Sequence, residues 1–187
     1  MSNDGANRAA SPDGGSALMG RAAAESGRAI ADLNQFISFA IGDDQYGVDI
    51  MAVREIKGWS QICALPRQPD YMRGVLNLRG VMVPIVDLRC RFGQGMTEAT
   101  PLHIIMVVQI DGRQVGLLAD RVLDIVNVEP SKIQPVPRVA EVARIDFLSG
   151  LVTVESGMIA LMDLSRLLAT SIREGADLAP APQDAAA

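Results

Sequence analysis

The chain alternates short apolar runs with clusters of turn residues, a pattern typical of β-strands. Residues 36–41 are mostly apolar, 42–44 read Gly-Asp-Asp, and the pattern resumes at Tyr46, as expected for a hairpin. The segment 104–119, IIMVVQIDGRQVGLLA, has an Asp-Gly pair between two apolar runs, which is the strongest short hairpin signal. These signals predict an all-β fold in which the helices are short.

A longer segment occurs twice at a constant spacing of 76 residues. GVLNLRGVMVPIVDLRCRF spans 74–92, and GLVTVESGMIALMDLSRLL spans 150–168. The two copies share the initial glycine, the apolar positions and a late Asp-Leu pair. Within the strand-forming part they differ in charge at one position, where the first copy has Arg79 and the second has Glu155.

The two predicted hairpins also repeat, at a spacing of 69 residues that aligns Gly47 with Gly116. Two related β units are therefore predicted. We expect them to form two small barrels packed against each other, because closure would hide strand edges and neither half has a generous core. Asp87 and Asp163 each follow a predicted strand directly, and we expect each to cap a helical turn.

Composition excludes several classes of protein. The 187 residues carry a formal charge of -5 and a pI near 4.9, which argues against phosphate-backbone binding and so against a nucleic-acid partner. No apolar run reaches about 18 residues, and the N-terminus shows no signal-peptide pattern, so we expect no membrane insertion and a cytoplasmic location.

The two ends differ in composition from the middle. Residues 1–33 are rich in Ala, Gly and Ser, and 171–187 end in APAPQDAAA. Neither segment has the aromatic and β-branched content needed to offset ordering entropy, so we expect both to be disordered tails. The ordered domain is predicted to span 34–170.

Most residues that could be catalytic or could bind a metal are better explained by structural roles. His103 is the sole histidine and cannot form a His-based metal site without partners, while Cys63 and Cys90 are interpreted as reduced thiols. Asp120 and Asp124 could share a helical face, but we favour a solvated surface for them. Neither of the phosphate-binding glycine motifs, GxxxxGK[ST] and a strand-linked GxGxxG, occurs, and Gly14-Gly15 lies in the expected tail. No catalytic residue, metal or cofactor is predicted. Several methionines are expected to fill the core, namely Met82, Met106, Met158 and Met162.

Most of the chain resembles one known family, that of the CheW chemotaxis coupling proteins. The matching stretches, in order, are FISFAIGDDQYGVDIMAVREIKG, PDYMRGVLNLRGVMVPIVDLRCRFG, VGLLADRVLDIV, IQPVP and FLSGLVTVESGMIALMDLSRLL. They cover about residues 35–169, and GVLNLRGVMVPIVDLR is highly specific. The resemblance implies two packed five-stranded SH3-like β-barrels and no enzymatic activity.

The resemblance also implies the partners. Family members bind the cytoplasmic tip of methyl-accepting chemoreceptors and the regulatory domain of the CheA-type histidine kinase, which places the kinase under receptor control in signalling arrays. We therefore expect an adaptor that associates with membrane receptor arrays or cytoplasmic receptor clusters. It should be a monomer when alone, with ring formation in arrays left open.

The resemblance indicates a receptor-binding groove. In the family the arginine of the NLRG motif pairs with a glutamate of the segment that resembles VREI, and here these residues are Arg79 and Glu55. By the same resemblance, four other residues match positions that the family ties to the groove, namely Val53, Gly74, Ile104 and Ile125. Each of these four is also a plausible core residue, and no kinase-binding residue is assigned.

Two alternatives stay open at this point. One is a small-molecule-binding or hydrolytic β-barrel that uses Asp87, His103 or Cys90, although their spacing does not favour it. The other is an adaptor of the same fold that serves a chemosensory pathway other than motility. The sequence does not separate that pathway from chemotaxis, because the output lies downstream of the kinase.

Overall fold

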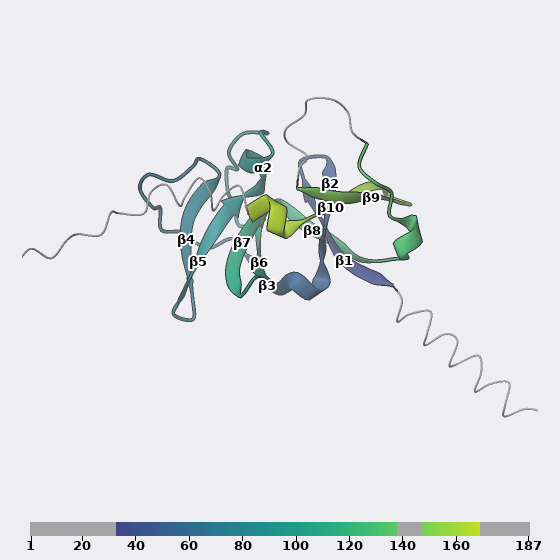
Figure 1. Cartoon of the computed structure of the whole chain (residues 1–187). Helices are drawn as coiled ribbons and strands as arrows, with labels where there is room; N and C mark the ends of the chain where they lie inside the picture. Colours follow the sequence, from purple (N-terminus) through teal and green to yellow (C-terminus); the bar gives the residue numbers. More distant parts are fainter. Residues whose placement is uncertain (1–32, 138–146, 169–187) are drawn as a thin grey trace, which may run out of the picture. The chain divides into compact units, whose positions relative to one another are not determined.

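The computed structural model describes residues 33–137 and 147–168 (Figure 1). All of its strands belong to the unit of the chain that begins at Asn34. The strands are β1 (Asn34–Ile41), β2 (Asp44–Asp49), β3 (Val53–Gly58), β4 (Met72–Leu78), β5 (Val81–Asp87), β6 (Ile104–Ile110), β7 (Arg113–Ala119), β8 (Arg121–Val128), β9 (Leu148–Val154) and β10 (Gly157–Met162). The short helices are η1 (Ile50–Ala52), α2 (Leu88–Arg91), η2 (Pro130–Lys132) and a helical segment at 164–168. Apart from Leu33, both expected tails lie outside the described residues.

The strands form two five-stranded sheets with equivalent orders, β8-β1-β2-β10-β9 and β3-β6-β7-β5-β4. Shifting every strand number by five converts one order into the other, so β1 to β5 and β6 to β10 are two copies of one unit. This confirms the repeat predicted from the sequence. Strands β1 and β2 pair with strands of the second copy, and β6 and β7 pair with strands of the first. Each sheet is therefore built from both halves of the chain.

Neither sheet closes into a complete ring of hydrogen-bonded strands, although the five-stranded SH3-like order is present in both. The expectation of fully closed barrels is wrong in that respect. The outer strands pair instead with isolated residues of the connecting segments, Val75 of β4 with Cys63 and Leu151 of β9 with Gln134. These bridges form hydrogen bonds with backbone groups of the outer strands β4 and β9, so those groups are covered without closure of the sheet.

The core consists of one hydrophobic cluster shared by the two sheets and one smaller cluster within each sheet. The shared cluster includes residues of both sheets and of the segment at 164–168, among them Phe39, Met106, Leu117 and Leu167, all with 0% exposure. One smaller cluster lies within the sheet of β3 to β7 and another within the sheet of β8 to β10. Because the largest cluster is common to both sheets, burial of apolar surface holds them together.

The repeated glycines predicted from the 69-residue spacing occupy equivalent close approaches. Gly47 of β2 lies beside Leu161 of β10, and Gly116 of β7 lies beside Ile85 of β5, in the parallel pair of each sheet. A Cβ at Gly47 would lie 2.9 Å from the Leu161 Cδ2 atom, and one at Gly116 would overlap the Ile85 Cδ1 atom. Glycine at both positions lets the large neighbour fill the core.

The two repeated aspartates cap helical turns, as the sequence predicts. The Asp87 Oδ1 atom accepts a hydrogen bond from the Cys90 N–H at 3.1 Å, and the Asp163 Oδ1 atom accepts one from the Arg166 N–H at 3.1 Å. Asp87 is fully buried and also accepts from the N–H and hydroxyl of Thr97, at 2.9 and 2.7 Å. Its carboxylate thus has a structural role.

Candidate functional site

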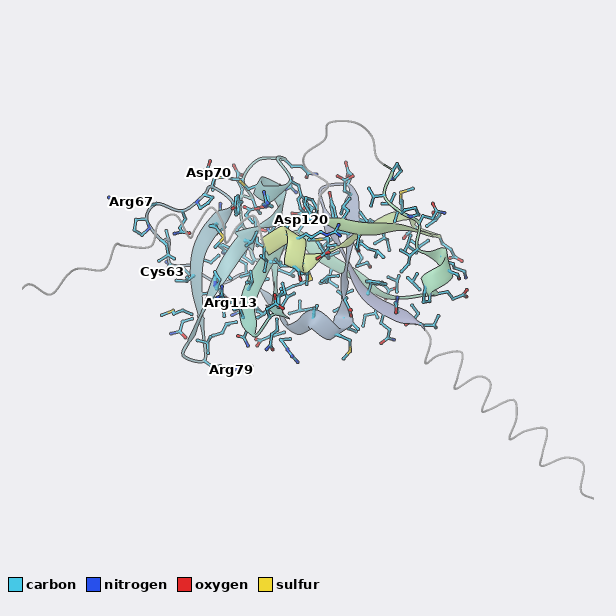
Figure 2. All side chains as sticks on the ribbon, in the orientation of Figure 1. Cys63, Arg67, Asp70, Arg79, Arg113 and Asp120 are labelled. Atoms are coloured by element: carbon cyan, nitrogen blue, oxygen red, sulfur yellow. The ribbon has the colours of Figure 1, made fainter. Side chains whose placement is uncertain are left out.

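A charged pair joins β3 to the turn between β4 and β5. The Arg79 Nη2 atom lies 3.4 Å from the Glu55 Oε2 atom. The Arg79 side chain is 87% exposed and that of Glu55 is 37% exposed. Figure 2 shows Arg79 at the tip of the β4–β5 turn, at the opposite end of these strands from Arg67 and Asp70. The pair is therefore presented to solvent.

The turn that carries Arg79 has an uncommon backbone. Leu78 pairs with Val81, so only Arg79 and Gly80 form the loop, with φ of 52° and 88°. Two-residue hairpin loops with positive φ at both positions favour Asn, Asp or Gly at the first position, because a Cβ is disfavoured there. The Asn77 Oδ1 atom accepts the Gly80 N–H at 2.8 Å and so supports the turn. An arginine thus occupies a position that local preference would give to another residue.

The equivalent residue of the second copy lacks both features. Glu155 is not among the described residues with positive φ, and it forms no ion pair with any described residue. The difference between Arg79 and Glu155 that is visible in the sequence is thus also a difference in backbone geometry. The repeated fold does not require an arginine at this turn.

Stability does not account for the pair. An exposed ion pair contributes at most about 1 kcal/mol, because water screens the charges and both side chains lose rotamer freedom. Placing a non-glycine residue at positive φ costs a similar amount. The net contribution of Arg79 to folding is therefore small, and its guanidinium keeps free donors for a partner.

Val53 and Ile125 differ in their relation to the pair. Val53 lies two residues before Glu55 on β3, is half-buried and packs against the shared core. Ile125 is 52% exposed and lies on β8, an edge strand of the other sheet, where it pairs with Ile37. An exposed isoleucine on an edge strand is available for contact with a partner.

Ile104 and Gly74 have structural surroundings. Ile104 pairs with Gly58, which is at the other end of β3 from Val53, and packs against the shared core. Gly74 is buried on β4 with φ of 128°, and a Cβ there would overlap the Cys63 carbonyl oxygen. Neither residue forms part of the charged pair in the described structure.

Sequence reasoning missed the exposed apolar residues beside Arg79. Val81 is 51% exposed and Met82 is 62% exposed, and both line a groove of about 870 Å³. Met106 and Met162 are buried as predicted, but the core assignment is wrong for Met82 and Met158, which point to solvent. Alternation was the available signal for Met82, because the core residues Val83 and Ile85 of β5 lie on the opposite face of the strand.

A second polar cluster connects the two sheets at Asp120, the residue between β7 and β8. The Asp120 Oδ2 atom accepts the Gly42 N–H at 2.7 Å and also a hydrogen bond from Arg89 of α2. The His103 Nε2 atom lies 3.7 Å from Asp120 Oδ1, and its Nδ1 accepts the Thr100 N–H at 3.0 Å. The expectation of a solvated Asp120 is wrong, because the chain crosses between sheets there and its side chain is only 15% exposed (Figure 2).

The residues of the hydrolytic alternative do not assemble into a catalytic arrangement. The Asp87 carboxylate is occupied by Thr97 and the helix cap, and His103 faces Asp120 instead. Burial, followed by the nearby charge of Asp87, raises the pKa of the Cys90 thiol and so disfavours a nucleophilic thiolate. Within the described residues no group of three or more His, Cys, Asp or Glu could hold a metal ion. No helix in the described part of the chain is long and apolar enough to cross a membrane.

Comparison with known proteins gives concordant matches. The family model of the CheW-like domain matches residues 35–171. The chain is 42% identical to the chemotaxis protein CheW of Rhizobium meliloti over 142 residues, which are 76% of this chain and 92% of that protein. It is 35% identical to CheW of Klebsiella aerogenes over 136 residues, 73% of this chain and 82% of that protein. The crystal structure of the scaffolding protein TtCheW from Thermoanaerobacter tengcongensis matches with a TM-score of 0.65 and 29% identity, covering 70% of this chain and 88% of that one.

Proposed function

The chain belongs to the CheW-like domain family, and on that premise we propose that it couples the cytoplasmic tips of chemoreceptors to a CheA-type histidine kinase. It acts as a non-enzymatic adaptor, in keeping with relatives that are named chemotaxis proteins and a structural neighbour described as a scaffolding protein. We place it in the cytoplasm, at receptor arrays or clusters. The kinase regulatory domain is its second partner.

The observation that carries the receptor proposal is the geometry of Arg79. An arginine at positive φ, exposed and absent from the equivalent turn of the second copy, contributes little to the fold. Residues held in sparsely populated backbone conformations cluster at functional sites, where the surrounding structure maintains the strain. Glu55 holds the guanidinium in place and leaves its other donors for a receptor group.

The receptor surface that fits this site is an amphipathic helix. Apolar anchors at i, i+3 and i+4 would contact exposed apolar side chains such as Ile125, and a polar group at the rim would meet the Arg79 guanidinium. The interface is of the small, transient kind, with affinity on the order of micromolar, so the adaptor alone should be monomeric.

Co-sedimentation with a receptor cytoplasmic fragment and the CheA-type kinase tests the proposal. We expect Arg79→Ala to weaken receptor binding by about tenfold or more, as for a central charged residue of an interface. Arg79→Glu should weaken it further, because it sets two carboxylates against each other at Glu55.

Arg67→Ala is the matched control. Arg67 is also an exposed arginine with positive φ, at 57°, but it lies in the loop at the other end of the β4–β5 hairpin (Figure 2). Receptor binding should survive this substitution, and all variants should keep the wild-type melting profile. Equal binding by Arg79→Ala and wild type would overturn the receptor role of the pair, and a folded wild type that binds neither partner would overturn the adaptor proposal.

A further inference from the structure

Strand β3 contains a β-bulge directly before Glu55. Val53 pairs with Val108 of β6 and Glu55 pairs with Val107, so two steps along β3 correspond to a single step along β6. Arg54 is the extra residue of the bulge and has no partner in the ladder. Bulges are common on edge strands, where they turn a side chain in a new direction, and β3 is an edge strand of its sheet.

The bulge determines which face of the sheet carries Glu55. Directly paired residues of antiparallel strands lie on the same face. Val108 belongs to the shared core, whereas Val107 belongs to the smaller cluster within the sheet of β3 to β7. In a regular strand Val53 and Glu55, two positions apart, would both lie on the face of Val108. With the bulge, Glu55 lies on the face of Val107 instead, away from the shared core.

The face of Val107 is shared with the strands that carry the Arg79 turn. The cluster that contains Val107 also contains Leu76 of β4 and Val83 of β5, and the turn connects these two strands. Glu55 is thereby placed on the same face as the core residues of β4 and β5, and its Oε2 atom lies 3.4 Å from the Arg79 Nη2 atom. The ion pair therefore depends on the extra residue in β3.

The second copy has an equivalent bulge that is held by a buried hydroxyl. In β8 the pairing with β1 shifts in register between Ile37 and Phe39. The buried Ser38 hydroxyl donates to the Asp124 C=O at 2.9 Å and accepts the Asp124 N–H at 3.0 Å. Asp124 corresponds to Glu55 at the 69-residue spacing, so this hydroxyl fixes the backbone at the position equivalent to Glu55.

The first copy has a surface contact in place of that buried one. Ser38 corresponds to Val107, whose side chain cannot form a hydrogen bond. Instead, the Arg54 Nε atom donates a hydrogen bond to the Gln109 Oε1 atom of β6 at 2.7 Å. This bond joins the extra residue of the bulge to the neighbouring strand, so it restrains the backbone that leads into Glu55.

We propose that Arg54 is a positioning residue for the receptor site, because its bond to Gln109 holds the bulge that presents Glu55 to Arg79. This inference rests on the receptor role proposed for the ion pair. Arg54 acts on Glu55 through the backbone that joins them, and it does so without a contact of its own with the receptor. The bond to Gln109 is therefore the part of Arg54 that matters for binding.

The NMR signal of the Arg79 guanidinium in the free protein tests the positioning step. Gln109→Ala removes the bond without changing any residue of β3, and it should move the Arg79 Nε–Hε signal in the same direction as Glu55→Ala does. Adding Val107→Thr, which supplies a hydroxyl at the position equivalent to Ser38, should reverse the change. An Arg79 signal that stays at its wild-type position in Gln109→Ala would overturn the inference. A change that Val107→Thr does not reverse would assign Gln109 a direct effect on Arg79 and would also overturn it.

Receptor binding then separates this inference from the proposed function. Arg54→Ala and Gln109→Ala should each weaken binding of the receptor cytoplasmic fragment by about threefold or more, and the double variant should bind no more weakly than either single variant, because all three lack the same hydrogen bond. Additive losses, or a loss in Arg54→Ala alone, would indicate a direct charge contact and overturn the inference. A wild type that binds no receptor would overturn the proposed function, and the Arg79 signal would still decide whether Arg54 positions Glu55.

Discussion

Gly74 was predicted to line the receptor groove, but its surroundings give it a structural role that a measurement of stability can test. It lies on β4 where the chain passes the segment containing Cys63, with which Val75 forms a two-hydrogen-bond bridge at 2.9 Å for each bond. A Cβ at Gly74 would overlap the Cys63 carbonyl oxygen and approach the Ala64 Cα atom at 2.9 Å. Both obstacles are backbone, so they cannot be relieved by a rotamer change.

The cost of Gly74→Ala follows from two contributions. Breaking the bridge loses two hydrogen bonds, each with a net contribution of about 1 kcal/mol. An alanine held at φ of 128° adds about 1 to 3 kcal/mol of backbone strain. The total of about 3 to 5 kcal/mol is a large part of the roughly 5 to 15 kcal/mol that stabilises a typical domain.

Urea denaturation followed by circular dichroism measures this loss, with Gly112→Ala as the control. Gly112 has φ of 78° in the β6–β7 turn, and a Cβ there would meet nothing within 4 Å, so only backbone strain of about 1 kcal/mol applies. The effect of alanine on the unfolded chain is common to both variants and cancels. If Gly74→Ala costs no more than Gly112→Ala, the close approach at Cys63 does not constrain β4, and the reasoning fails.

Other predictions concern the polar and titratable groups. Arg89→Ala and Asp120→Ala should be coupled by about 1 to 3 kcal/mol in a double-mutant cycle of unfolding, and additive losses would contradict the inter-sheet contact. Burial raises the pKa of Tyr46 to about 12, so its stabilising contribution is complete below the unfolded value near 10 and is lost as pH rises through 12. Tyr46→Phe should therefore lose less stability than wild type between pH 10 and 12 in alkaline unfolding, and parallel curves would refute this. With a thiol reagent at pH 8, exposed Cys63 should react faster than Cys90, whose pKa is raised by burial, and a single fast phase of two thiols would contradict it.

Much of the fold was predictable because the sequence is locally consistent. The Asp111-Gly112 pair closes the β6–β7 hairpin, and the aspartates at the ends of the repeated strands, Asp87 and Asp163, are helix caps. The 76- and 69-residue spacings predicted two related units, and the structure contains two sheets of the same strand order. These features depend on neighbours that are close in sequence or on exact repetition.

Features that depend on distant partners were not predictable in this way. Alternation identifies a strand but not its neighbour in the sheet. No local signal therefore indicates that β1 and β2 pair with β8 and β10, or that β6 and β7 pair with β3 and β5. The same limit explains Asp120, whose partners Gly42 and Arg89 are brought to it by the crossover between sheets. For Glu55 and Arg79 the resemblance supplied the pairing, because they are 24 positions apart in the sequence and β6 and β7 lie between β3 and β5 in the sheet.

The internal repeat offers a criterion for finding function in this chain. Gly47 and Gly116 are the same in both copies because each sheet needs the same close approach. At the turn after β4 and the turn after β9 the two copies carry different residues, so the repeated fold does not require an arginine there. Arg79 differs from Glu155 in charge, in backbone conformation and in its ion pair. Selection for packing alone would have no reason to keep an arginine at a turn that disfavours it, so the asymmetry of the two turns is the physical argument for a partner at the first.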